Sequence, residues 1–481
     1  MSQRNITLIS NVFQLFIYLG VLTFIVVKSA TLQVTCDESY TLQILAKERV
    51  WDIVMYTSSY TNNHILNTLA VKGLYELFGL NFLLGRLPNI LSFLLYGYIV
   101  FRFAEKFIDN TVECIALMAI MVGSPYLLDF FACARGYGMT VSLIMVSMYY
   151  GALYITNNRY KNLVLCLFAA ILCVYAQFGS LHYFLAICTL LGGFSLADLY
   201  QSKNLKAFAK QIATLITAAV VLFGLIYFPI KSILKDNQIA YYGKAGFWQD
   251  TIRSLIQKSI YGQGYFSSNT LAVFEILTAL LLVASAILVI QQKAKNRLSL
   301  YICLIFWITT FSIVAQFKLL GNQYPIDRTA LFLYPIIMLN FVNLFACFKR
   351  INKYIYGVMI AVAIIFPINH LIRSCNLKSY AEWWYDVNTF EVLSFLKKKC
   401  KDDAITFYAG GWFRPSFSYH IEEQGLKSIQ LEPYSPTLDT TGKFDYYYIF
   451  GSEKEPLTKY TTIEKSFFGG NILLLKNNSK K

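Results

Sequence analysis

Long runs without a charged residue constrain this chain more than any other feature of its sequence. No Asp, Glu, Lys or Arg occurs between Arg4 and Lys28, and similar gaps separate Arg135 from Arg159, Lys210 from Lys231, Arg297 from Lys318, Arg328 from Lys349, and Lys353 from Arg373. A hydrocarbon core about 30 Å thick is crossed by roughly 20 apolar residues in a helix. Each run is therefore predicted to be a transmembrane helix.

The remaining apolar segments bring the expected number of transmembrane helices to about eleven. Residues 162–197 are too long for one crossing, and the stretch Gln177–His182 at their middle is predicted to be a tight turn between two helices. Shorter charge-free runs follow Arg86 and Glu113, and a further span is predicted at residues 272–292.

The composition supports a membrane protein and argues against a soluble one. Apolar residues make up 56% of the 481 residues and charged residues only 14%, whereas about a quarter of a typical soluble domain is charged. The net charge of 42 − 27 = +15 is spread between apolar spans and forms no long basic stripe, so no nucleic-acid partner is expected. The predicted fold class is a polytopic α-helical membrane protein.

The placement of Lys and Arg predicts how the chain is oriented in the membrane. Four short loops are strongly basic and are expected to be cytoplasmic: residues 159–161, 198–210, 293–297 and 349–353. The N-terminus is then cytoplasmic, and an odd number of spans places the C-terminus on the periplasmic or extracellular side. We expect the protein to lie in the inner membrane of a bacterium.

Most of the polar sequence falls on the outer side of this topology. Residues 1–375 are predicted to form a transmembrane domain with two long outer loops, 28–86 and 231–271. Residues 376–481 are predicted to form a small extracytoplasmic α/β domain, with a helix at 391–399 and strands at 402–408, 444–450 and 471–476.

The ten cysteines give little indication of a metal site. Most lie singly in predicted helices, where Cys behaves as a small apolar residue. There is no CxxC motif and no Cys/His cluster, so no zinc site is expected. Cys375 and Cys400 are the pair that an oxidising compartment would allow to form a disulfide, and the alternative is that they remain free thiols.

The first candidate for chemistry is the acidic pair Asp37–Glu38, which follows the first predicted helix. Charged residues near the bilayer are costly and are often functional. The alternative is structural, because Asp and Glu also suit the N-terminus of a helix that begins near Ser39.

A second candidate is the AsnAsnHis sequence that contains Asn63 and His64, followed by Arg86 in GlyArgLeuProAsn. His64 is one of only four histidines in the chain. A single His is often an interfacial residue, and Arg86 could equally be an anchor at the start of a helix.

Two further motifs bring cations and tyrosines to the same predicted membrane surface. AlaArgGlyTyr contains Arg135 and Tyr137, and the later motif contains Tyr324 and Arg328, with Lys318 upstream. Each residue could be a helix-end anchor. Together they suit an anionic lipid headgroup, which a guanidinium can hold through two oxygens.

These motifs, in this order, resemble the GT-C membrane glycosyltransferases. The nearest branch is the protein O-mannosyltransferase/aminoarabinose-transferase-like group, glycosyltransferase family 39-like. The resemblance covers residues 1–375. It departs at His64-Ile65-Leu66, where many relatives have HisProPro, and at Arg328-Thr329, where the motif often reads Arg-Tyr.

The resemblance implies a sugar donor on polyprenyl phosphate and assigns roles by position. Asp37 is the implied catalytic carboxylate, with Glu38 as its partner. The residues implied to bind the donor phosphate are His64, Arg86, Arg135, Arg328 and Lys318. Those implied to line the substrate site are Tyr137, Asn63 and Tyr324.

The chemistry of such a donor fits these residue types. Polyprenyl phosphate leaves as an anion, which cations can stabilise without a general acid, while a carboxylate can take the proton of the acceptor hydroxyl. We therefore expect an inverting glycosyltransferase that acts on the outer face on a lipid, glycan or protein hydroxyl. No cofactor is required; a divalent metal is compatible with the reaction but is not indicated.

Two other classes of protein remain as alternatives. A transporter or flippase for a lipid-linked sugar would also bind phosphate through cations, but commonly shows two related halves, and no such repeat is seen. An O-antigen-type polymerase or ligase would place its arginines in a large outer loop, and the loop 231–271 does contain Lys244, Arg253 and Lys258.

Overall fold

A computed structural model describes residues 3–58, 62–235, 243–261, 268–291, 296–400, 404–433 and 437–478. These residues form two compact units, each described separately below. The first unit comprises Met1–Val27, Arg49–Ala70 and Arg86–Cys375. The second comprises Lys28–Glu48, Val71–Gly85 and Asn376–Lys481.

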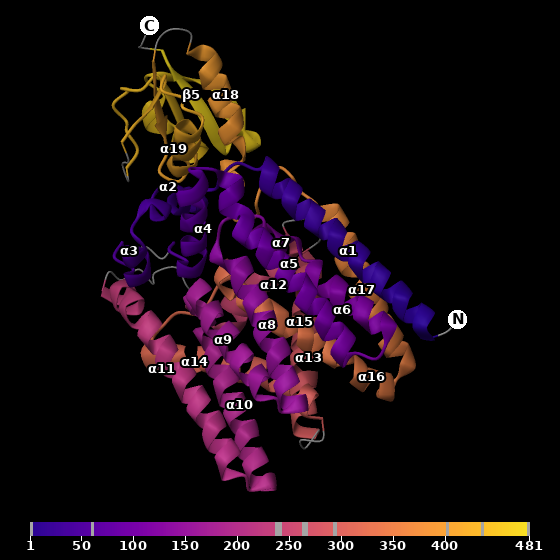
Figure 1. Cartoon of the computed structure of the whole chain (residues 1–481). Coiled ribbons are helices and arrows are strands. Elements are labelled where there is room, and N and C mark those ends of the chain that lie inside the picture. The colour runs from indigo at the N-terminus through magenta and orange to yellow at the C-terminus, as the bar shows by residue number, and fades with distance from the viewer. Residues whose placement is uncertain are drawn as a thin grey trace. The chain divides into compact units, whose positions relative to one another are not determined.

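Long apolar helices dominate the first unit (Figure 1). Among the described residues, nine helical segments are long and apolar enough to cross a membrane. They are α1 (Gln3–Thr31), α5 (Phe82–Phe107), α8 (Gly136–Asn157), α10 (Leu181–Ser202), α11 (Leu205–Lys235), α13 (Ser268–Gln291), α14 (Arg297–Leu320), the run η4–α15–α16 (Asp327–Leu333, Tyr334–Asn343, Phe345–Ile351) and α17 (Lys353–Ser374).

Two more segments account for the remaining predicted spans. Helices α6 (Thr111–Val122) and α7 (Pro125–Phe131) form a pair bent by 64° and make a tenth span if counted together. Helix α9 (Tyr160–Ala176) is apolar but has only 17 residues. The turn predicted between the two central spans is confirmed, because α9 ends at Ala176 and only η2 (Phe178–Ser180) precedes α10.

The exposed faces of these helices require lipid. Only 17% of the most apolar stretch of α13 is buried, compared with 78% of that of α8. The exposed side chains of α13 are large and apolar: Val273, Ile276, Leu277, Leu280, Val283, Ile287 and Ile290. An apolar surface of this kind is unfavourable in water, and the chain is a multi-pass membrane protein.

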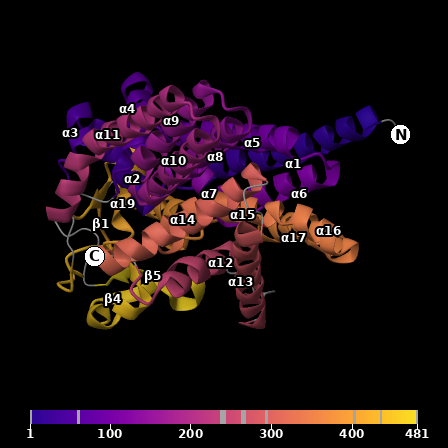
Figure 2. The same ribbon diagram turned by 90° about the horizontal axis from the view of Figure 1, so that it is seen from below.

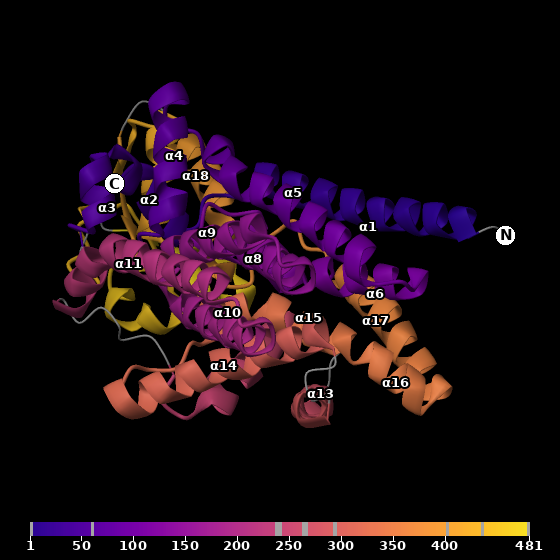
Figure 3. The ribbon, with the colours of Figure 1, turned by 60° about the horizontal axis from the view of Figure 1, so that its bottom comes forward.

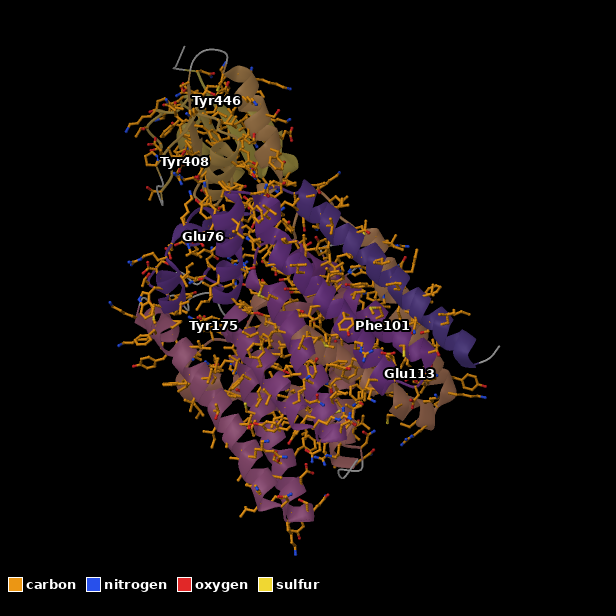
Figure 4. All side chains as sticks on the ribbon, in the orientation of Figure 1. Glu76, Phe101, Glu113, Tyr175, Tyr408 and Tyr446 are labelled. Carbon is orange, nitrogen blue, oxygen red and sulfur yellow. The ribbon has the colours of Figure 1, made fainter. Side chains whose placement is uncertain are left out.

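The helices of the first unit pack as neighbouring antiparallel and crossing pairs. Helix α8 lies along α9, and α10 packs against α9, α11 and α14 (Figure 2). Helix α17 packs against α6 and α16, and α13 lies at the periphery beside α14 (Figure 3). The Tyr356 hydroxyl on α17 donates to Glu113 Oε1 on α6 over 2.7 Å (Figure 4).

The segments predicted to be the long loops 28–86 and 231–271 are more helical than expected. The loop 28–86 contains α2 (Cys36–Gln43), η1 (Leu45–Lys47), α3 (Val50–Met55) and α4 (Ile65–Phe78). In the loop 231–271, residues 247–253 form the π-helix η3 (Phe247–Arg253) and residues 254–260 form α12 (Ser254–Ile260). Residues 236–242 and 262–267 of that loop, and 292–295 of the basic loop 293–297, lie outside the described residues.

The second unit contains a five-stranded mixed sheet in the order β2-β1-β3-β5-β4. Strand β1 pairs in parallel with β2 and β3, and β5 pairs antiparallel with β3 and β4. The strands are β1 (Ile405–Ala409), β2 (Ile429–Leu431), β3 (Tyr446–Phe450), β4 (Thr461–Phe467) and β5 (Ile472–Asn477). Helices α18 (Thr389–Lys399) and α19 (Arg414–Glu423) belong to the same unit.

Alternating side chains give this sheet two apolar faces. Phe407 and Tyr446 pack with residues of α18 and α19, whereas Tyr408 and Tyr447 pack on the opposite face with Leu457 (Figure 4). Successive residues of a strand point to opposite sides, so an unbroken run such as Tyr446–Phe450 buries both faces at once. A sheet covered on both sides explains why these strands are continuously apolar.

The three predicted strands and the helix of the C-terminal domain are confirmed. Their observed bounds are 405–409, 446–450, 472–477 and 389–399. The sequence did not predict β2, which has three residues, or β4, which is an exposed edge strand with the burial pattern of a surface. Helix α19 was also missed, because its mixture of aromatic and polar residues hides the helical repeat of apolar positions.

The cysteines lie within the described parts of the chain, and all ten are free thiols. The disulfide considered between Cys375 and Cys400 is therefore not formed. Cys375 is exposed and Cys400 is half-buried beside the Ser428 carbonyl.

A buried carboxyl in the sheet should make the stability of the protein depend on pH. Burial raises the pKa of Glu432 to about 7, although the Ala409 N–H and Arg414 partly oppose the shift. The proton is then bound more tightly in the folded state, so stability is greatest at low pH and is lost as pH rises toward about 7, at up to about 1.4 kcal/mol per pH unit.

We expect thermal unfolding of the detergent-solubilised chain between pH 5 and 8 to show this loss in the wild type but not in Glu432→Gln. The exposed control Glu455→Gln should behave as the wild type; an unchanged slope in Glu432→Gln would contradict the assignment.

Candidate functional site

Arg135 is a buried cation of the first unit. It is the N-cap residue of α8, with an extended backbone, and only 1% of its surface is exposed. Its Nη1 donates to the Asn62 backbone oxygen over 3.0 Å, and its Nη2 donates to Asn62 Oδ1 over 2.8 Å. One asparagine thus binds both terminal nitrogens of the guanidinium group, which restricts the orientation of the Arg135 side chain.

His64 lies beside this arginine and is held by a helix end. Its Nδ1 is 2.9 Å from the carbonyl oxygen of Ala176, the last residue of α9, and its ring meets the Tyr137 ring edge-on at 4.7 Å. Tyr137 in turn lies 5.9 Å from the Arg135 guanidinium carbon. Because the carbonyl can only accept, Nδ1 carries the hydrogen and Nε2 presents a lone pair.

The Nε2 atom of His64 is buried and has no hydrogen-bond partner among the described residues. The pKa of His64 lies well below its ordinary value, first because burial disfavours the charged form, and then because Arg135 and Arg328 are nearby. The imidazole is therefore neutral at physiological pH and offers an acceptor, not a positive charge.

A glycine makes this arrangement sterically allowed. A Cβ atom on Gly136 would clash with the Ala176 carbonyl oxygen and would lie 2.7 Å from both Cγ and Nδ1 of His64. The close approach of α8 to the imidazole therefore explains the glycine of the AlaArgGlyTyr motif.

Two asparagines connect Arg86 to the same region. Arg86 is fully buried, and one turn later on α5 Asn89 Nδ2 donates to Asn67 Oδ1 over 2.8 Å. Asn67 Nδ2 donates to the Ala134 carbonyl over 3.2 Å. The start of α5, the first turn of α4 and the residue before Arg135 are thereby joined.

Arg328 reaches this region through the segment that precedes α15. Gln177, directly after α9, donates from Nε2 to the Thr329 carbonyl over 3.0 Å. The preceding residue, Asp327, has a positive φ of 50°, and its carboxylate lies 3.5 Å from Lys258 Nζ. A non-glycine residue with positive φ is uncommon and needs surrounding contacts to hold it.

Lys318 and Tyr324 have surroundings of a different kind. Lys318 is exposed in the last turn of α14, and its Nζ lies 5.9 Å from the Phe317 ring. Tyr324 is buried, stacks on Phe317 at 4.3 Å and exchanges two backbone hydrogen bonds of 2.8 Å with Gly243. These contacts make Tyr324 an anchor for the outer loop, so its role as a substrate-lining residue stays a prediction.

The acidic pair lies in the second unit, in the first turn of α2. Thr35 caps this helix: the Glu38 N–H donates to Thr35 Oγ1 over 3.2 Å, and the Thr35 N–H donates to Glu38 Oε2 over 3.0 Å. Glu38 is fully buried, whereas Asp37 is partly exposed. The structural interpretation of the acidic pair thus applies to Glu38. Asp37 is the partly exposed member, with its Oδ2 atom buried.

Six of the predicted residues belong to one connected region of the first unit: Asn63, His64, Arg86, Arg135, Tyr137 and Arg328. Asp37 and Glu38 belong to the second unit, so their meeting with the arginines in one site stays a prediction. The sequence placed Asn62, Asn67 and Asn89 within its candidate motifs and Gln177 at a predicted turn, but it gave none of them a role in the site. Asn62 was detectable as the first residue of AsnAsnHis, and Gln177 as the polar start of the predicted turn.

Among the described residues, no group of three or more His, Cys, Asp or Glu side chains could hold a metal ion.

Asn63 is a further buried polar group, with Nδ2 donating to the Ile53 carbonyl over 2.9 Å and Oδ1 lacking a partner in the described parts of the chain. The first-unit region therefore combines guanidinium donors with two buried acceptors, which suits a ligand that carries both an anion and hydroxyl groups.

No protein-family model and no curated protein matches the chain. The chain is similar to the solved structure of ArnT from Cupriavidus metallidurans in the apo state, with a TM-score of 0.49, 11% identity and coverage of 96% of this chain and 97% of that chain. For the same protein bound to undecaprenyl phosphate the TM-score is 0.48 and the identity 11%, with coverage of 97% of this chain and 98% of that chain. For the arabinosyltransferase EmbB from Mycobacterium smegmatis the TM-score is 0.44 and the identity 11%, with coverage of 85% of this chain and 42% of that chain. All three likenesses have TM-scores below 0.5.

The packing around His64 predicts a steric effect of a single methyl group. Gly136→Ala should displace the imidazole from the Ala176 carbonyl and destabilise the protein by about 1–3 kcal/mol, the usual cost of overpacking. The measurement is thermal unfolding in detergent. Gly193→Ala on α10, where a Cβ meets no atom within 4 Å, is the matched control and should not be destabilised. A Gly136→Ala midpoint equal to that of the control would refute the close approach.

Proposed function

We propose that this chain is an inverting glycosyltransferase that moves a sugar from a polyprenyl-phosphate donor to an acceptor hydroxyl at the outer face of the membrane. The observation that carries the proposal is the fixed guanidinium of Arg135, held by Asn62 beside a neutral His64 and near Arg328. A multi-pass membrane protein has little other use for buried cations held in this way.

A phosphate monoester on a lipid is the ligand that suits these cations. The leaving polyprenyl phosphate gains negative charge as its bond to the sugar breaks, and guanidinium groups already oriented toward it stabilise that charge without reorganisation. Arg86 is fully buried at the start of α5 and is a further candidate. No general acid is needed, because the departing oxygen leaves as an anion.

His64 is proposed to recognise a hydroxyl next to the phosphate. Its Nε2 is a buried acceptor without a partner among the described residues, and an acceptor cannot bind a phosphate oxygen that carries no hydrogen. A sugar hydroxyl can donate to it. Asn63 Oδ1 offers a second acceptor of the same kind.

Asp37 is proposed to be the general base. Its carboxylate takes the proton of the acceptor hydroxyl while the hydroxyl oxygen forms a bond to the anomeric carbon. The bond from that carbon to the phosphate oxygen breaks on the opposite side, and its electrons leave with the polyprenyl phosphate. One displacement of this kind inverts the anomeric centre. Of the acidic pair, Asp37 is the partly exposed member.

The contacts of the outer loop favour this function over the polymerase or ligase alternative. Arg253 Nε lies 3.1 Å from Glu275, and Lys258 Nζ lies 3.5 Å from Asp327. These cations are therefore engaged in ion pairs. A transporter differs in its outcome, because it would return the donor chemically unchanged. The proposed location remains the inner membrane of a bacterium, with the C-terminal domain outside.

Removal of the proposed base should stop the reaction. With a panel of polyprenyl-phosphate sugars and an envelope extract as the acceptor source, we expect the wild type to release free polyprenyl phosphate, detected by mass spectrometry. Asp37→Asn should lower the rate by about 10²–10⁴-fold, the usual contribution of a general base. Glu105→Gln, which changes an exposed carboxylate paired with Arg102, should keep the wild-type rate. Near-normal turnover by Asp37→Asn would remove Asp37 from this role.

The phosphate-binding proposal makes a separate prediction about affinity. Arg135→Ala and Arg328→Ala should each weaken the binding of undecaprenyl phosphate by roughly 10- to 100-fold, because a hydrogen bond to a charged group contributes about 1.5–3 kcal/mol. Binding can be followed by thermal stabilisation on titration with the lipid. Arg102→Ala, at the exposed end of α5, is the control. Unchanged affinity in both test variants would overturn the site.

A further inference from the structure

The segment that carries Asp37 is bonded to the C-terminal domain inside the second unit. The Val34 N–H donates to His420 Nε2 over 3.0 Å, and the Val34 carbonyl accepts from the Ser416 hydroxyl over 2.6 Å. The Cys36 N–H donates to Asp386 Oδ2 over 2.8 Å. Three backbone groups on either side of the cap residue of α2 are therefore satisfied by side chains roughly 350 or more positions away in the sequence.

His420 is fixed in one tautomer by its two partners. A backbone N–H can only donate, so Nε2 must be the acceptor and Nδ1 carries the hydrogen, which points to Glu423 Oε2 at 3.0 Å. The side chain is fully buried, and the Phe390 ring lies 4.6 Å from it. This histidine is thus an acceptor with a defined direction.

Asp386 makes the corresponding contact at Cys36, the residue directly before Asp37. It is 1% exposed, Oδ2 accepts from the first N–H of α2, and Oδ1 has no hydrogen-bond partner in the described parts of the chain. The pKa of Asp386 lies well above its ordinary value, first because it is buried and then because Asp37 and Glu38 are nearby. A neutral carboxyl holds the N–H without adding a third negative charge beside Asp37.

The other end of α2 is held by the same domain. Glu422 on α19 accepts from Gln43 Nε2 over 2.7 Å and from Lys47 Nζ over 2.8 Å. Both ends of an eight-residue helix are thus bonded by side chains of α19 and of the segment before α18. Such a short helix is marginal by itself, so these contacts set its position.

We propose that Asp386 and His420 are positioning residues for the reaction: by holding the backbone of Cys36 and Val34 they fix the first turn of α2 and aim the Asp37 carboxylate. This inference rests on the proposed function, in which Asp37 is the base. The C-terminal domain is then a working part of the active site and not an accessory to it.

The test compares variants that remove each acceptor with variants that retain it. Asp386→Ala and His420→Ala lose the acceptor, whereas Asp386→Asn and His420→Gln keep an oxygen that can accept the same N–H. We expect kcat for polyprenyl phosphate release to fall about 10- to 100-fold in the two Ala variants, because a small misplacement of a reacting group has effects of this size. The Asn and Gln variants should recover most of the rate, and the affinity for undecaprenyl phosphate should be unchanged in all four.

A matched control separates positioning from general damage to the domain. Asp445 Oδ2 also accepts a backbone N–H over 2.8 Å, that of Thr406 in the sheet. Asp445→Ala should lower thermal stability without lowering kcat. Amide hydrogen exchange in the full-length protein in detergent should become faster at residues 34–38 in Asp386→Ala but not in Asp445→Ala.

The outcomes distinguish the two proposals. If Asp37→Asn is inactive while Asp386→Ala and His420→Ala keep the wild-type kcat, the positioning role is wrong and the proposed function stands. If the wild type releases no polyprenyl phosphate, the proposed function fails; if Asp37→Asn is active, Asp37 is not the base and the positioning role fails with it. In either case the exchange measurement alone decides whether Asp386 holds the first turn of α2. Equal kcat losses in Asp386→Ala, Asp386→Asn and Asp445→Ala would also overturn the inference.

Discussion

Backbone carbonyls at and between the ends of helices, which side chains must satisfy, are the constraint on which the candidate site depends. At the edge of an apolar bundle such groups are costly unless side chains satisfy them. Here the carbonyl of Ala176 is bonded by His64, that of Ala134 by Asn67 and that of Thr329 by Gln177. The polar side chains of the site are therefore structural supports at the same time, and the supports give them fixed directions.

This double use explains why the site can be both polar and well ordered. Arg135 caps α8 with its backbone while Asn62 holds its side chain, and Gly136 lets the imidazole of His64 approach within contact distance. Orientation settled during folding does not have to be acquired when a ligand binds, which is the basis of electrostatic preorganisation. A flexible surface arginine would lose side-chain entropy on binding.

The second unit uses the same principle over a longer distance in sequence. Its helix α2 is too short to be stable alone, and the side chains of Asp386, Ser416 and His420 bond the backbone at its start. The acidic pair is divided by this arrangement. Glu38 completes the capping box with Thr35, and Asp37 remains partly exposed. Two neighbouring carboxylates of similar chemistry thus have different surroundings because of their positions in one helical turn.

Much of the fold was predictable, because it depends on local patterns. Charge-free runs located the apolar helices, and the polar stretch Gln177–His182 located the turn between α9 and α10. The strands at 405–409, 446–450 and 472–477 were found from their apolar and aromatic residues. The short β2 and the exposed β4 were missed, since both are strands only because neighbouring strands pair with them. In the site, the motifs indicated His64 and Arg135, but not that Glu38 completes the capping box of α2 while Asp37 stays partly exposed.

The sequence by itself determined that this is a multi-pass helical protein with a small α/β domain, because hydrophobic burial and helix length act locally along the chain. It also determined which residue types are available for anion binding and proton transfer. Only the tertiary structure decided that Asn62 holds Arg135, that Gln177 bonds Thr329 and that Asp386 bonds Cys36. These partners lie 73, 152 and 350 positions apart. No local pattern encodes such pairs, because a hydrogen bond depends on which helix ends the packing brings within about 3 Å of each other.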